Sequence, residues 1–127
     1  MSQEKFSFEN LDIWKRAVEF VRIIVEITET INTKNKHFRL IEQLESAAAS
    51  VALNIAEGSG RYSKKEFIRF LYIARGSLYE TVTLLTIFKN NNWITDKQFV
   101  YTKSFSVTLT RMLSGLINSL KTPNHEL

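Results

Sequence analysis

The sequence predicts an all-α protein, an antiparallel up-down-up-down four-helix bundle that forms a single domain over residues 1–127. Three observations predict this fold. The length is that of one ordinary domain. The four glycines and single proline are too few turn-forming residues for a β-sandwich or barrel. Apolar residues also recur at helical spacing in four segments, within a composition typical of globular proteins, 44% hydrophobic and 24% charged.

The first two helices are predicted from amphipathic spacing. Residues 11–31 place Ala17, Val21 and Ile24 on one face and charged residues on the other. Residues 38–57 carry an apolar stripe through a run of small side chains, which would let another backbone come close. Gly58 follows, and we expect it to end this helix in the left-handed conformation that glycine adopts freely.

The last two helices are predicted from their start signals. Ser63 and Glu66 have capping-box spacing before a helix over residues 64–89. Thr95 and Gln98 have the same spacing before a helix over residues 96–120. The three connectors are short, so consecutive helices should be antiparallel neighbours.

The third helix has more apolar surface than a lone bundle needs. Its apolar arc is about 200° wide, against the ~100° that a core-facing stripe requires. A mid-helix glycine also costs about 1 kcal/mol against alanine, so close approach by a neighbour should compensate. We therefore expect a homo-oligomer; the alternative is that the ends of the same chain cover this surface. The expected interface residues are Phe70, Ile73, Gly76, Leu84 and Ile87.

The charge is unevenly distributed. Residues 1–60 hold seven Lys/Arg against nine Asp/Glu, and residues 61–127 hold ten against four. This asymmetry indicates either an acidic partner or association of opposite faces between copies. A basic cluster near the third helix, beside tyrosines, suits phosphate contacts and base stacking, although a solvated surface stripe is the plainer interpretation. The cluster consists of Arg61, Lys64, Lys65, Arg69 and Arg75.

No residue pattern predicts catalysis. Cysteine is absent, which excludes thiol nucleophiles and thiolate metal sites. His37 and His125 lie in a connector and in the tail, so no metal, cofactor or enzymatic activity is expected. Asn54, Glu57, Ser77 and Glu80 form a polar set on the second and third helices. This set is either a network that fixes helix register or a pair of active-site carboxylates, and the network is favoured because no nucleophile accompanies it.

Several motifs together resemble one family. They are Asn54-Ile55-Ala56-Glu57-Gly58, Gly60-Arg61, Gly76-Ser77 followed by Glu80, and the opening Leu11-x-Ile13-Trp14. In these the chain resembles the 23S rRNA intervening-sequence four-helix-bundle proteins. The resemblance implies a ring-like homopentamer with no catalytic residues. It extends to the accessory protein of diversity-generating retroelements, which acts with a reverse transcriptase and nucleic acid. The chain departs from the family in having Glu45-Ser46 after Gln43-Leu44, where relatives often have basic residues.

The functional expectation is a non-enzymatic bacterial homo-oligomer that binds RNA or DNA non-specifically through a basic surface. The alternative is a protein-interaction scaffold of a ring assembly that binds no nucleic acid, with a reverse transcriptase or another protein as a possible partner. The chain begins without the basic-then-apolar order of a signal peptide and has no long apolar run. We therefore expect a cytoplasmic protein with no membrane contact.

Overall fold

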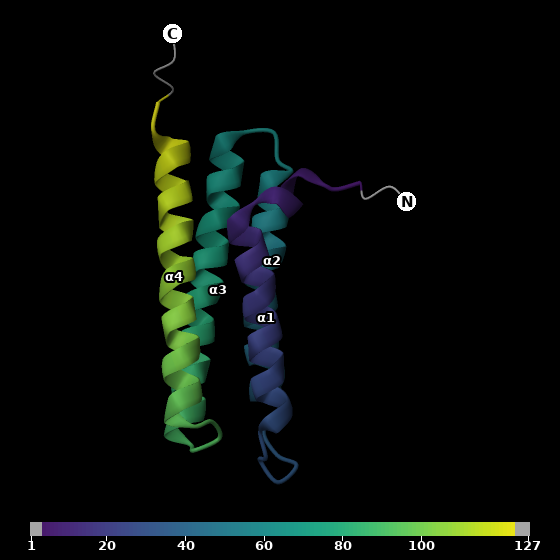
Figure 1. Cartoon of the computed structure of the whole chain (residues 1–127), viewed down its shortest axis with the longest axis vertical. Helices are drawn as coiled ribbons and strands as arrows, with labels where there is room; N and C mark the ends of the chain where they lie inside the picture. Colours follow the sequence, from purple (N-terminus) through teal and green to yellow (C-terminus); the bar gives the residue numbers. More distant parts are fainter. Residues whose placement is uncertain (1–3, 124–127) are drawn as a thin grey trace.

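The computed structural model describes residues 4–123, which form an antiparallel up-down-up-down bundle of four long helices (Figure 1). A short 3₁₀ helix, η1 (Ser7–Asn10), precedes α1 (Asp12–Thr30); α2 (Phe38–Ser59), α3 (Lys64–Asn90) and α4 (Asp96–Lys121) follow. Within the described residues there is no β-strand. The four-helix fold is confirmed, and every predicted helix boundary lies within two residues of the observed one.

The helix starts follow from side-chain caps. At α4, the Thr95 hydroxyl accepts from the Gln98 amide at 3.0 Å, and Gln98 Oε1 accepts from the Thr95 amide at 2.9 Å, which completes the predicted capping box. At α3, Ser63 accepts from the Glu66 amide at 3.1 Å, but the Glu66 carboxylate does not reach back. It accepts from Arg69 instead, so only half of the predicted box forms.

The core runs the length of the bundle and draws from all four helices. Fully buried residues include Phe20 of α1, Leu44 of α2, Leu78 of α3 and Leu113 of α4. The Phe20 ring stacks on Phe105 with ring centroids 5.6 Å apart, which ties α1 to α4. The most extensive helix contact is between α2 and α3.

Gly58 has a role different from the predicted one. It lies inside α2, which continues to Ser59, and no glycine of the chain has a positive φ. The predicted left-handed helix end at Gly58 is therefore wrong. An ideal Cβ built on Gly58 would lie 2.6 Å from Cβ of Phe70, so the residue serves close approach between α2 and α3.

Candidate nucleic-acid interface

The apolar surface predicted on α3 is smaller in the structure. Phe70 and Leu84 are only 7% and 4% exposed, so both lie inside their own protomer and the expectation that they face another subunit is wrong. The physical reason is the tight packing of α2 on α3, which covers part of the arc that looked free on a helical wheel. Ile73 and Ile87 remain exposed, at 40% and 37%. Apart from the adjacent residues and backbone of its own helix, no atom of residues 4–123 lies within 4 Å of an ideal Cβ on Gly76, so that position is open to a neighbour.

The predicted basic cluster divides into two parts. Arg61 bonds to Glu57 at 2.8 Å and Arg69 to Glu66 at 3.2 Å. Both guanidinium groups also lie over the Phe70 ring, 4.7 and 4.6 Å from its centroid. They therefore cover the Phe70 side chain at the end of the interface between α2 and α3.

The lysines of the cluster, Lys64 and Lys65, are exposed in the first turn of α3 and make no ion pair among the described residues. Arg75 lies on the other side of α3. Its Nη1 is 3.3 Å from the Ser114 hydroxyl oxygen of α4, and its guanidinium is 4.8 Å from the Tyr72 ring centroid. Arg75 therefore belongs to a different surface from Arg61 and Arg69.

That second surface is a strip where α3 meets α4, in which cations lie beside aromatic rings. The Lys89 and Lys103 ammonium groups are 5.0 and 5.6 Å from the Phe99 centroid. At the other end, Lys121 lies 5.2 Å from the Tyr72 centroid. We call this surface the α3/α4 strip; its residues are Tyr72, Arg75, Tyr79, Lys89, Phe99, Lys103, Arg111 and Lys121.

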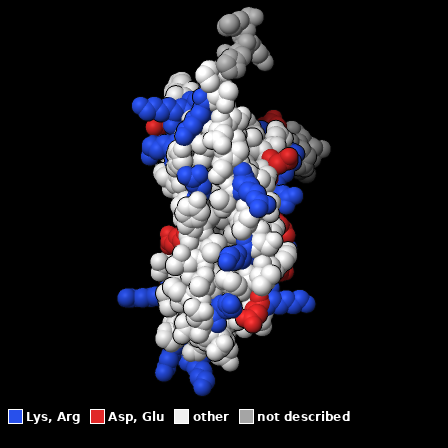
Figure 2. Space-filling view, turned by 90° about the vertical axis from the view of Figure 1, so that its left-hand side faces the viewer, with Lys and Arg blue, Asp and Glu red and all other residues white. Residues whose placement is uncertain are grey.

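The charge of the α3/α4 strip is almost unopposed. None of its five cations makes a salt bridge within residues 4–123. Glu66 of α3 bonds to Arg69, and Glu80 accepts from Gln43 of α2 at 3.4 Å, while the sole carboxylate of α4 is Asp96 at its first residue. Figure 2 shows one face of the molecule on which Lys and Arg recur along its length and outnumber Asp and Glu. Such a face attracts polyanions.

Positive charge near Tyr72 changes the pKa of its phenol. Lys121 Nζ donates to the Tyr72 hydroxyl oxygen at 2.6 Å. This hydrogen bond first, and then the charges of Lys121 and Arg75, lower the pKa of the Tyr72 phenol below its usual value of 10.0. A phenolate is thus stabilised where a phosphate would be stabilised too.

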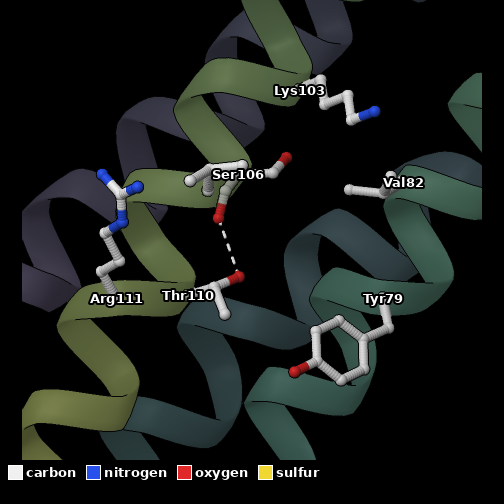
Figure 3. Close-up of a pocket in the computed structure, with 7 residues that line it drawn as sticks. Tyr79, Val82, Lys103, Ser106, Thr110 and Arg111 are labelled. Atoms are coloured by element: carbon white, nitrogen blue, oxygen red, sulfur yellow. Dashed lines mark hydrogen bonds between the residues drawn. The ribbon is translucent and has the colours of Figure 1, made fainter.

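The middle of the strip contains a cavity of about 340 Å³ between α3 and α4. Figure 3 shows Tyr79 and Val82 on the α3 side, facing the α4 residues across the opening. Lys103 extends toward α3 at one end, whereas the Arg111 guanidinium lies on the opposite side of α4 from Val82 (Figure 3). Apolar surface from Tyr79, Val82 and Val107 dominates the lining.

The predicted polar set does not form one network. Asn54 Nδ2 and the Ser77 hydroxyl both donate to the Ser50 hydroxyl, each at 2.9 Å, so Ser50 joins two of the four residues. Glu57 and Glu80 bond to Arg61 and Gln43 instead. Within the polar set, Ser50 of α2 is therefore the residue that joins Asn54 to Ser77 of α3, and its small side chain in an alanine-rich run was the available sequence signal.

Sequence reasoning missed most of the strip. Lys89, Lys103, Arg111 and Lys121 are spread over more than thirty residues of sequence, and only the register of α4 against α3 aligns them. It also missed Tyr62, which is fully exposed between Arg61 and Lys64 in the α2–α3 connector. Among residues 4–123, no three His, Asp or Glu side chains cluster as metal ligands would, and no helix has the length and apolarity to cross a bilayer. His125 lies outside the described residues.

The bundle and its basic strip define a class of protein, the small four-helix bundles that expose a cationic face. The sequence matches the family described as 23S rRNA-intervening sequence protein over residues 9–115, and the chain belongs to this family. A crystal structure of a protein of unknown function from the S23 ribosomal protein family of Bacteroides thetaiotaomicron is similar, with a TM-score of 0.78 and 25% identity. The match covers 87% of this chain and 99% of that one. A search of curated proteins found no match. Neither description names an enzyme.

Proposed function

We propose that this protein binds RNA or DNA without sequence preference and without catalysis, through phosphate contacts made by the α3/α4 strip. The observation that carries the proposal is the row of five cations that make no salt bridge within the described chain. From Arg75 to Lys89 the strip follows α3 for about 21 Å at ~1.5 Å per residue. At ~3.4 Å per phosphate along one strand of a duplex, that length faces about six phosphates.

The predicted basic cluster supports the same function from the end of the bundle. Lys64 and Lys65 lie in the first turn of α3, where the helix dipole adds to their positive charge. Tyr62 is exposed beside them and offers a ring on which a base can stack. Arg61 and Arg69 contribute less, because each already bonds to a carboxylate.

Self-association belongs to the proposal. Ile73, Gly76 and Ile87 form the exposed part of the predicted interface, and the family resemblance implies a pentameric ring. Repeating a weak site around a ring would raise the overall affinity for a long strand by avidity.

The test is fluorescence anisotropy with a labelled 20-nucleotide RNA and DNA at two salt concentrations. Removing two strip charges with Lys89→Gln and Lys103→Gln should weaken binding and reduce the salt slope by about 1.4–1.8, since each phosphate contact contributes ~0.7–0.9. The matched control is Lys15→Gln with Arg16→Gln, an equal charge change on exposed residues of α1. No affinity at low salt, or equal losses in the two double variants, would refute the proposal.

The alternative is a ring scaffold that binds other proteins, such as a reverse transcriptase, and no nucleic acid. The apolar exposure of Ile73 and Ile87 and the opposite charges of the two halves of the chain favour it. Size-exclusion chromatography after mixing with total RNA separates the two functions. A scaffold would elute without absorbance from nucleic acid, whereas a nucleic-acid-binding protein would co-elute with RNA and release it at high salt.

A further inference from the structure

We propose that the cavity beside Tyr79 accepts one unstacked base, so that the α3/α4 strip prefers single-stranded RNA or DNA to duplex. This inference rests on the proposed function and adds a substrate class to it. It depends on whether a cation of the same chain already lies over each of the three aromatic rings of the strip, Tyr72, Tyr79 and Phe99.

Two of the three rings already make cation–π contacts with side chains of the same chain. Tyr72 has the Arg75 and Lys121 charges 4.8 and 5.2 Å from its centroid. Phe99 has Lys89 and Lys103 at 5.0 and 5.6 Å. Tyr79 has no cation over its ring among the described residues and is 56% exposed. Tyr79 is therefore the ring of the strip that remains available for stacking.

The surroundings of Tyr79 suit a base rather than another charged group. The cavity volume of about 340 Å³ lies within the ~300–1,000 Å³ range of small-molecule sites. Val82 and Val107 provide apolar walls for the flat face of a base. The Thr110 hydroxyl, which donates to the Ser106 carbonyl at 2.9 Å, keeps lone pairs that can accept from an amino group of the base.

The charges around the cavity suit the backbone that carries such a base. Lys103 and Arg111 both line the cavity, but only the Lys103 ammonium group extends toward α3, since the Arg111 guanidinium lies on the opposite side of α4 from Val82. A phosphate of a strand whose base enters the cavity can therefore meet the Lys103 ammonium group. A duplex holds its bases stacked inside, so it would reach the cations of the α3/α4 strip and leave Tyr79 unused. Single-strand preference follows from that difference.

The test compares a labelled single-stranded 12-mer with the corresponding 12-base-pair duplex, using the full chain and anisotropy. Tyr79→Ala should weaken single-strand binding ~5- to 150-fold, the range for loss of one base–aromatic stack. Duplex binding should change less than about twofold, and the salt slope should not change, because no phosphate contact is lost. Tyr79→Phe should retain wild-type affinity. The matched control is Tyr101→Ala, since Tyr101 is also 56% exposed but outside the cavity lining. Circular dichroism on each variant checks folding.

The outcomes separate this inference from the proposed function. If Tyr79→Ala binds single strands as well as wild type does, or loses single-strand and duplex binding equally, the base site is refuted while nucleic-acid binding stands. If the wild-type protein binds neither strand form, the proposed function itself fails. If an acidic amphipathic peptide binds in a Tyr79-dependent way while oligonucleotides bind independently of Tyr79, the cavity is a peptide site and the inference is overturned.

Discussion

Replacing Gly58 with alanine should destabilise the protein, although alanine is the better helix former. Gly58 is helical, so the substitution by itself gains about 1 kcal/mol of helix propensity. The new methyl group would lie 2.6 Å from Phe70 Cβ and 3.1 Å from Phe67 Cδ1. Phe70 Cβ is attached directly to the α3 backbone, so no rotamer change relieves the first contact. Restoring the ordinary ~3.5 Å between carbon atoms requires α2 and α3 to separate by about 1 Å.

Overpacking of this kind costs about 1–3 kcal/mol, and the backbone-bound neighbour places Gly58→Ala toward the upper end. The net expected loss is about 2 kcal/mol. Gly115→Ala is the matched control, because Gly115 is helical and exposed and an ideal Cβ there meets no atom of another described helix within 4 Å. It should gain about 1 kcal/mol. The two variants should thus differ by about 3 kcal/mol.

Urea unfolding followed by circular dichroism measures this difference. With a slope of ~1–3 kcal/mol per molar urea, the two midpoints should differ by at least about 1 M. Measurement at several protein concentrations separates folding from self-association. If Gly58→Ala proves as stable as Gly115→Ala, the close approach of α2 and α3 at Gly58 is not what requires a glycine there.

Three further outcomes are expected. Ile73→Glu should lower the mass measured by light scattering, because it places a charge on the proposed subunit face; an unchanged mass would show that Ile73 lies outside any interface. Gly76→Leu should impair assembly more than Gly76→Ala, as seen by size-exclusion chromatography, if a neighbouring subunit approaches this open position. Ionisation of Tyr72, followed at 295 nm as the difference from Tyr72→Phe, should occur below pH 10, and Lys121→Met should move it upward. Because the shift is downward, its contribution to stability is present above pH 10 and is lost as pH falls through the lowered pKa; an unmoved titration would contradict the Lys121 contact.

The helices themselves were predictable because the signals for them are local. Ser63 and Thr95 cap the chain at the predicted starts, and apolar residues recur with the helical period between the caps. Such signals act between residues three or four positions apart, so they are readable without knowing how the helices pack.

The candidate site was predictable only in part. Arg75 was identified, but it was grouped with Arg61 and Arg69, which lie on a different side of α3 around Phe70. A helical wheel gives the direction of each side chain relative to its own helix axis only. It does not say which directions a neighbouring helix covers, and for that reason Phe70 and Leu84 were wrongly assigned to an outer surface.

The amino-acid sequence by itself determined an all-α chain of four helices, with boundaries within two residues of the observed ones, and a basic second half. Only the tertiary structure decided that Gly58 brings α2 against α3, that Ser50 joins Asn54 to Ser77, and that cations from α3 and α4 align in one strip around Tyr79. The physical reason is the sequence separation over which each kind of interaction acts. Helix formation and capping depend on neighbours within a turn, whereas a shared surface depends on the register between helices, which close packing sets.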